Sequence, residues 1–337
     1  MATRNRVSFL VYTLLISAVW VAWYFLGGPG LFAGMGENWG VSVTMLFGSF
    51  IAGATSEGGG ALAFPVFTKL LDIPPADAKI FSLAIQSVGM TCASLMILVM
   101  RVPVEWRAVR WASLGGVAGI GAGSCLAGVL PPSLIKMSFT VMVSSFALVL
   151  IIMKNNNGLD RNTFLIRFGL LERAVLVVVG VCGGIMSGLV GNGIDIITFS
   201  VLVLLFKLCE KVATPTSVIL MAINSLAGFF LHVEAGVFTP QIQAYWLAAV
   251  PVVVVGAPFG AIVCARMRQS AIAWVLISLI FVELGTSLWI IRLPADLALL
   301  CGGVFLVSTF LYYAMYQSGF YWQTAASVGD PSGLDEN

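Results

Sequence analysis

The sequence predicts an all-α polytopic membrane protein with about eight full transmembrane helices and two broken re-entrant hairpins, arranged in two inverted repeats. Of the 337 residues, 59% are hydrophobic and 9% are charged, whereas soluble domains average about 25% charged residues. The apolar residues form unbroken runs of about 20, the length of a membrane-spanning helix, without the alternation of a transmembrane β-barrel. These observations exclude a soluble enzyme, a secreted disulfide scaffold, a coiled coil and a disordered chain.

Eight apolar runs, each bounded by charged residues or by proline and glycine, are long enough to cross a bilayer. They cover residues 7–26, 80–100, 111–129, 134–153, 215–233, 243–263, 271–291 and 296–316. The first run follows Arg4 and Arg6 but is too long for the apolar part of a signal peptide. We therefore expect it to remain as the first helix.

Two further apolar regions are interrupted near their middle. Residues 41–71 contain Thr55, Ser56 and Glu57 followed by three glycines, and residues 174–208 contain Gly191-Asn192-Gly193. Glycine costs a helix about 1 kcal/mol relative to alanine, so such clusters predict an unwound segment. The arms of the first region hold 14 and 11 residues, shorter than a full span, which favours a re-entrant hairpin.

The distribution of basic residues indicates how often each broken region crosses. If both regions return to their starting face and the N-terminus is cytoplasmic, thirteen basic residues lie inside and four outside, namely Lys69, Lys79, Lys136 and Arg292. A single crossing of each region gives nine against eight. Because cytoplasmic loops carry the excess of Lys and Arg, the returning arrangement is favoured, with both termini cytoplasmic and no Arg or Lys inside the spans.

The two broken regions also mark an internal repeat. Gly58-Gly59-Gly60 precedes Gly191-Asn192-Gly193 by 133 residues, and an offset of 135 then pairs Ala78 with Ala213, Ser82 with Ser217, Trp111 with Trp246 and Gly121 with Gly256. One hairpin plus three spans is an odd number of crossings, so the second copy is expected to be inverted. Inverted repeats with discontinuous helices indicate secondary transport with a substrate site near the midplane; the alternative is a duplicated scaffold that transports nothing.

This repeat defines the expected organisation of the chain. It consists of residues 1–40 as the first helix and outer loop, 41–153 as repeat 1, 154–173 as a cytoplasmic connector, 174–291 as repeat 2, 292–316 as the last helix, and 317–337 as a cytoplasmic tail.

A Gly-rich break, an apolar run with Pro65, a Pro-containing turn and an Ala-x-x-x-Ser helix start (Ala78 to Ser82, repeated at Ala213 to Ser217) resemble the TauE/SafE family of sulfite exporters. The resemblance covers residues 41–291 and departs in the second half, where Asn192 interrupts the glycines and Thr198 replaces the proline. It implies two homologous halves and export of sulfite or a small organosulfonate; some branches of the family take up sulfur compounds.

The breaks are the expected substrate site. Helices restarting at Ala61 and Ile194 would point free N–H groups and a positive dipole end toward the break, which suits a small oxyanion. The alternative is that the glycines only permit close helix packing. The candidate substrate-binding residues are Thr55, Ser56, Gly58, Gly59, Gly60, Ser82, Gln86, Gly191, Asn192, Gly193, Ser217 and Asn224. Gln86 and Asn224 lie four and seven residues past Ser82 and Ser217, so each shares a helical face with its serine. We expect both to line one cavity; the alternative is that each forms a hydrogen bond to a neighbouring helix.

Three acids lie near membrane depth, where a charge is costly and usually functional. Glu57 and Asp195 flank the breaks and are candidates for proton coupling, and Glu283 is equally compatible with a structural hydrogen bond. The cysteines are scattered singly, so we expect no metal site and no cofactor. The expected partners are a small anion and the lipid bilayer, with no nucleic acid. An intramembrane enzyme is disfavoured because no HExxH motif occurs and His232 is the only histidine; a passive anion channel and an uptake carrier stay open.

Overall fold

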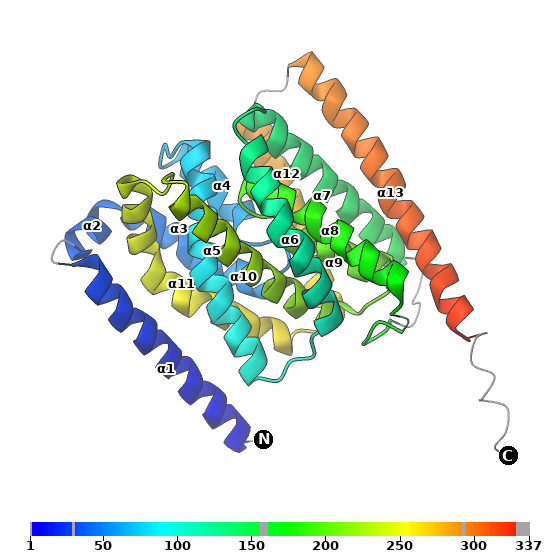
Figure 1. The fold of residues 1–337 in the computed structure, drawn as a ribbon, viewed down its shortest axis with the longest axis horizontal. Helices are drawn as coiled ribbons and strands as arrows, with labels where there is room; N and C mark the ends of the chain where they lie inside the picture. The colour runs from blue at the N-terminus through cyan, green and yellow to red at the C-terminus, as the bar shows by residue number, and fades with distance from the viewer. Residues whose placement is uncertain (1, 29–30, 156–160, 167, 292–293, 328–337) are drawn as a thin grey trace.

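The computed structural model describes residues 2–28, 31–155, 161–166, 168–291 and 294–327. Within these residues the regular secondary structure is helical, as the sequence predicts (Figure 1). The helices are α1 Ala2–Gly27, α2 Leu31–Glu37, α3 Trp39–Ala54, α4 Gly60–Lys69, α5 Pro75–Val99, α6 Trp106–Leu126, α7 Pro132–Asn155, α8 Leu170–Val190, α9 Ile194–Leu204, α10 Glu210–Glu234, α11 Pro240–Arg266, α12 Gln269–Ile290 and α13 Ala295–Ser327.

Eight of the described helices are long and apolar enough to cross a membrane: α1, α5, α7, α8, α10, α11, α12 and α13. Their positions agree with the sequence analysis except that α8 stands in this set and the run at 111–129 does not. That run belongs to α6, which has 21 residues but carries Arg107 and Arg110 near its start. The first arm of the second broken region, α8, is thus long enough to span, whereas α3 and α9 are shorter apolar helices.

The last helix is longer than expected. It continues to Ser327, so residues 317–327, which we assigned to a polar tail, are helical. The remaining residues of that tail, 328–337, lie outside the described residues, as do 156–160 of the connector and Arg292. In Figure 1, α1 and α13 lie at opposite edges of the bundle; α1 packs on α5 and α11, and α13 packs on α7 and α9.

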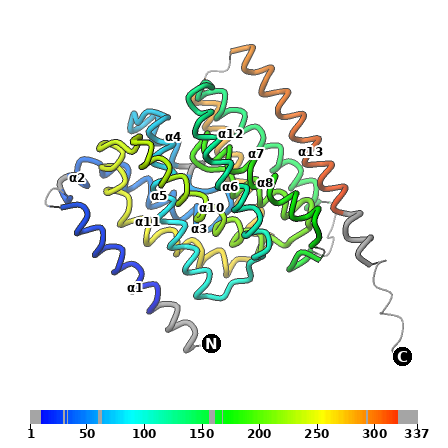
Figure 2. The backbone as a smooth tube through the Cα atoms, viewed as in Figure 1, coloured from blue at the N-terminus to red at the C-terminus, as the bar shows by residue number. Residues whose placement is uncertain are grey.

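The helices of the two halves interlock rather than forming separate bundles. Helix α3 packs along α11 while α8 packs along α6, α4 contacts α12 while α9 contacts α7, and α5 contacts α10 near the middle of the molecule (Figure 2). Each of these contacts joins one helix from residues 41–153 with one from residues 174–291. The broken region of each half is therefore covered by helices of the other half.

Glycines set the close contact between α6 and α8. A β-carbon added to any of the facing glycines would lie between 2.1 and 2.6 Å from a backbone carbonyl oxygen of the partner helix, closer than real atoms approach. The glycines are Gly115, Gly119 and Gly123 on α6 and Gly180, Gly184 and Gly188 on α8. Small residues spaced four apart let two helix backbones touch in a membrane, so here the packing explanation of the glycines is correct.

Candidate functional site

The first break separates α3 from α4. Helix α3 ends at Ala54, and Thr55 closes its last turn because its Oγ1 donates to the carbonyl of Ile51 at 3.0 Å. The backbone N–H of Glu57 then donates to the same Oγ1 at 3.4 Å. Gly58 has a φ of +72°, a conformation that only glycine adopts without strain. Ser56 and Glu57 are buried, so the break lies inside the protein.

The second break separates α8 from α9. Gly191 and Gly193 have φ values of +96° and +146°, a region of backbone conformation that favours glycine. The N–H of Ile194, the first residue of α9, donates to the hydroxyl of Ser187 at 3.1 Å. Helix α9 restarts at Ile194 as the sequence predicts, and α4 restarts at Gly60, one residue before the predicted Ala61.

The two breaks meet in the centre of the molecule. The side-chain amide of Asn192 donates to the backbone carbonyl of Glu57 at 3.3 Å. A β-carbon on Gly58 would lie 3.1 Å from Asp195 Oδ2 and 3.4 Å from Asn192 Nδ2. Residues from two distant parts of the sequence thus form one polar cluster.

Helix α5 holds the second break from one side. Ser82 Oγ and Gln86 Nε2 both donate to the carbonyl of Gly191, at 3.1 and 3.0 Å, and Gln86 Nε2 also donates to Ser82 Oγ at 2.7 Å. The spacing of four residues places both side chains on the same face of α5. The sequence analysis selected this pair on that ground, and the structure brings the pair to the break.

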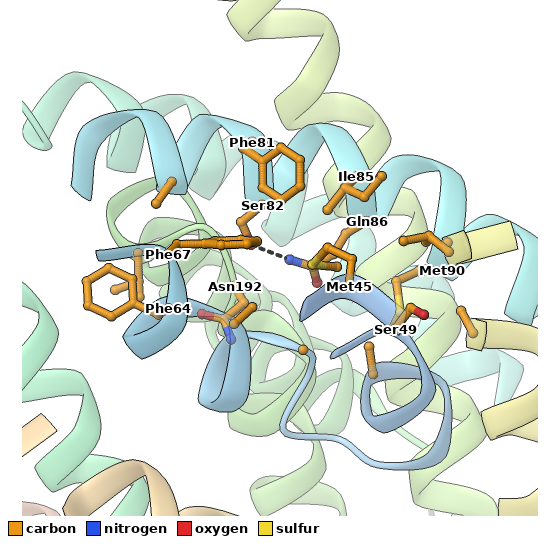
Figure 3. Close-up of a pocket in the computed structure, with 18 of the residues that line it drawn as sticks. Met45, Ser49, Phe64, Phe67, Phe81, Ser82, Ile85, Gln86, Met90 and Asn192 are labelled. Atoms are coloured by element: carbon orange, nitrogen blue, oxygen red, sulfur yellow. Dashed lines mark hydrogen bonds between the residues drawn. The ribbon is translucent and has the colours of Figure 1, made fainter. Parts of the chain in front are cut away.

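A cavity of about 40 Å³ opens beside this cluster, with room for a few water molecules. Gly59, Ser82, Gln86 and Asn192 line it among the predicted residues, together with Lys136 and apolar side chains such as Phe64, Phe67, Phe81 and Met90. Figure 3 shows Ser82 and Gln86 projecting from one helix toward the space that Asn192 borders from below. Few polar groups within apolar walls are typical of small-molecule sites.

Two predicted residues lie elsewhere. Ser217 Oγ donates to the carbonyl of Thr214 one turn back on α10. Asn224 is buried without a hydrogen-bond partner among the described residues, and a β-carbon on Gly116 would lie 2.9 Å from its Oδ1. Neither residue lines the cavity that Gln86 lines.

The two helix starts differ in what covers them. Asp195 lies in the first turn of α9, is fully buried, and accepts a hydrogen bond from the N–H of Ile196 at 3.0 Å. Its own carboxylate therefore occupies the positive end of α9, where the sequence analysis expected a substrate anion. Helix α4 has no side-chain cap, and its N-cap residue Gly59 lines the cavity. The helix start that is open to a ligand is therefore that of α4.

Lys136 is the site residue that sequence reasoning missed. The expectation places Lys136 on the outside and no cation within the spans, although the predicted span 134–153 includes it. In the structure it is 5% exposed, lines the cavity and forms an ion pair with Glu283 of α12. Its ammonium nitrogen also lies 4.9 Å from the centroid of the Phe64 ring, a cation–π contact. The available signal was that Lys136 and Glu283 both fall inside predicted spans, where opposite charges pair.

A second carboxyl group joins this ion pair. The carboxyl group of Glu57 lies close enough to Glu283, Asp195 and Lys136 for their charges to interact. The centre of the protein thus combines one ammonium group, that of Lys136, with the three carboxyl groups of Glu57, Asp195 and Glu283.

Comparison with known proteins assigns the chain to a family. The family model described as Sulfite exporter TauE/SafE matches residues 41–288, which includes both breaks and the helices around them. No curated protein and no solved structure gave a significant match. Members of the matched family are membrane transporters and not enzymes, which agrees with the eight apolar helices. Because the match covers well over half of its length, this chain belongs to the TauE/SafE family of sulfite exporters.

Proposed function

We propose that the protein is a secondary transporter that exports sulfite or a small organosulfonate anion through the site where the two breaks meet. The observation that carries this proposal is the uncapped start of α4 beside a buried cavity lined by Ser82, Gln86, Asn192 and Lys136. The family match supports the transport of a small anion.

The anion is held by three kinds of group. The backbone N–H groups at the start of α4 point toward the break and carry the positive end of the helix dipole. The amide of Asn192 and the hydroxyl of Ser82 supply further donors, which now bind backbone carbonyls. The ammonium group of Lys136 supplies the counter-charge, and the substrate competes with Glu283 for it. This competition keeps binding weak enough for release.

Proton coupling is part of the proposal, with Glu57 and Asp195 as the coupling groups. Three oxygen atoms near Gly58 have no hydrogen-bond donor among the described residues, namely Glu57 Oε2, Asp195 Oδ2 and Gln86 Oε1. A proton on either carboxyl group would provide such a donor and remove a negative charge that repels the anion.

The coupling groups are tested by replacing each acid with its amide. Asp195→Asn and, separately, Glu57→Gln should flatten the pH dependence of flux more than they reduce anion binding. Unchanged pH profiles in both variants would remove these acids from the mechanism and indicate an uncoupled carrier.

We also propose that the two halves are inverted repeats with both termini in the cytoplasm. The reciprocal helix contacts between the halves support the inversion, and the excess of Lys and Arg supports the orientation. Single cysteines at positions 161, 236 and 266 should react with an impermeant reagent from the cytoplasmic, outer and cytoplasmic side, respectively. Accessibility of 161 and 236 from one side would contradict the inverted arrangement.

The substrate is tested by anion flux in proteoliposomes that contain the purified protein. Sulfite, sulfate, thiosulfate, sulfoacetate and chloride are compared with and without a pH gradient. Saturable flux of sulfite or sulfoacetate, driven by the gradient, is the expected result. Flux that does not saturate would indicate the channel alternative, and accumulation toward the cytoplasm would indicate an uptake carrier.

A further inference from the structure

A second and larger cavity, of about 320 Å³, lies nearer to the C-terminal ends of α3, α5 and α11 than the central cavity does. It is enclosed by the C-terminal parts of α3, α5 and α11, by the start of α10, and by the loops before α6 and α8. Its lining is Gly53, Ile97, Val102, Pro103, Thr163, Cys209, Lys211, Val212, Thr214, Pro215, Val218, Ala261, Cys264 and Ala265.

Thr214 provides an unsatisfied polar group in this lining. It is 1% exposed, and its hydroxyl oxygen has no hydrogen-bond partner among the described residues. Thr216, on the same helix, shows the usual arrangement, because its hydroxyl donates to Val212 O and accepts from the N–H of Glu105. Leaving a buried hydroxyl unpaired is unfavourable, so the cavity beside Thr214 fits a ligand that accepts a hydrogen bond.

Positive charge faces the same cavity from the start of α10. This helix of 25 residues begins at Glu210 without a side-chain cap, and the cavity is lined by Cys209, Lys211 and Val212 of its first turn. The neighbouring Glu210 is ion-paired with Arg161 and hydrogen-bonded by Gln269. Lys211 forms no ion pair within the described part of the chain, so its charge is available to an anion.

One apolar cluster separates this cavity from the central one. Ala52, Met90 and Ala257 belong to the cluster and line the central cavity, whereas Ile97, Val218 and Ala261 belong to it and line the second cavity. Along α3 the lining passes from Ala52 to Gly53, and along α11 from Ala257 to Ala261, which is one turn. The two cavities are therefore neighbours, about one helical turn apart along α11.

We propose that this second cavity, hereafter the vestibule, is a separate anion-binding site from which the transported anion enters the central cavity. The proposal rests on the proposed transport function. The ligand class is a small sulfonate or sulfite: Thr214 donates to one oxygen, while Lys211 and the start of α10 balance the charge. The apolar residues Ile97, Val102 and Val218 accommodate the short carbon chain of an organosulfonate.

The first test measures loading from each face of the membrane separately. Thr214→Val and Lys211→Gln are compared with wild type in inside-out and right-side-out vesicles, using sulfoacetate. Loss of one hydrogen bond or charge contact should raise KM about fivefold for loading from the vestibule face, which is the membrane face at which α10 begins. KM for loading from the opposite face should stay unchanged. Equal effects at both faces, or none, would overturn the proposal.

Two control variants match these changes away from the vestibule. Thr91→Val removes a hydroxyl that already donates to Ser87 O within α5. Lys154→Gln removes a lysine that instead contacts Ser270 and Trp274. Both should keep the wild-type KM at both faces. A similar rise in KM in the controls would mean that general damage or loss of surface charge explains the result, and would overturn the proposal.

The second test does not depend on transport. Cys209 and Cys264 line the vestibule, so their modification by N-ethylmaleimide is followed in a protein whose other four cysteines are serine. Methanesulfonate should slow the reaction in this background and lose that effect when Thr214→Val and Lys211→Gln are added. Protection without any flux would retain the vestibule and refute the proposed function. Flux without protection would retain the function and refute the vestibule.

Discussion

The side-chain amide of Asn192 donates a hydrogen bond to the backbone carbonyl of Glu57, 135 positions earlier in the sequence, at 3.3 Å. It is a direct side-chain link between the two breaks, and its donor lines the central cavity. Ser82 and Gln86 of α5 also bind the second break, at the carbonyl of Gly191.

The first prediction concerns this link. Asn192→Asp replaces the donor with a carboxylate that cannot donate and adds a negative charge beside Asp195. Loss of the hydrogen bond together with this repulsion should weaken anion affinity by at least about tenfold, or about 1.4 kcal/mol, as measured by flux KM. Asn38→Asp is the matched control, because the Asn38 amide also donates to a backbone carbonyl, that of Gly34, far from the cavity. If both variants behave alike, Asn192 has no special role in binding.

The second prediction separates backbone strain from site blockage. Gly58→Ala and Gly236→Ala both place alanine at positive φ, +72° and +67°, at a cost of about 1–2 kcal/mol each. Only the β-carbon at Gly58 approaches polar groups of the site; the one at Gly236 has no atom within 4 Å. Thermal unfolding should show similar destabilisation, whereas only Gly58→Ala should lose anion binding. Retained binding in Gly58→Ala would exclude a substrate at this break. Gly59 is less suitable, because a β-carbon there would lie 2.7 Å from the carbonyl of Gly48.

The third prediction distinguishes the structural role of Lys136 from its role in binding. Lys136→Met leaves Glu283 buried without its cation and should destabilise the protein by about 3–5 kcal/mol. The double variant Lys136→Met/Glu283→Gln removes both charges, so thermal stability in detergent should largely return while sulfite flux stays absent. A stable double variant that transports normally would show that the pair only holds α7 to α12.

The fourth prediction concerns Glu105, the N-cap residue of α6, which lies in the loop between α5 and α6. Its carboxylate binds the Arg107 side chain and accepts from the N–H of Leu165 at 2.9 Å. Burial alone would raise the pKa of Glu105, but these hydrogen bonds and the Arg107 charge together lower it from its ordinary value of 4.5. A lowered pKa stabilises the folded state above the ordinary value, and this stabilisation is lost as pH falls through the folded-state value.

Glu105→Gln should therefore be less stable than wild type at pH 7, by about 2 kcal/mol. The difference should shrink as the pH falls from the ordinary pKa of 4.5 through the lower folded-state pKa, where wild type also loses the charge. Thermal unfolding at a series of pH values measures this, with the exposed Glu234→Gln as control. A difference that does not depend on pH would mean that the ionised form of Glu105 contributes nothing.

Apolar runs and glycine clusters predicted most of the helices and both breaks, because length and helix propensity are local properties. The expected span 111–129 differs from the observed helix because α6 starts at Trp106, so that every long stretch of it includes Arg110 together with several glycines of low hydropathy. The Arg107 side chain at the helix start is paired with Glu105. Hydropathy does not record such pairing.

The site was only partly predictable, because a sequence pattern does not record which residues from distant segments come into contact. Helical spacing placed Ser82 and Gln86 on one face, but it does not say which cavity a face meets, so Asn224 was grouped with them. Lys136 lies near the start of its helix and was counted as external, since its cover comes from Phe64 and from Glu283, 147 residues away. Asp195 was recognised at a helix start, but the sequence does not show that its side chain turns back to its own helix.

The glycine contacts between α6 and α8 have a mechanical consequence. Gly53 on α3 and Gly260 on α11 meet their partner helix just as closely, with β-carbon positions 1.9 Å from Ala257 O and 2.1 Å from Phe50 O. Where two helix backbones touch, no layer of side chains separates them that could rearrange as one helix slides past the other. We therefore expect the α3–α11 pair and the α6–α8 pair each to move as one rigid body. The movement that this packing favours for opening a path between the two cavities is a rocking of the α3–α11 pair against the α6–α8 pair about the α5–α10 contact.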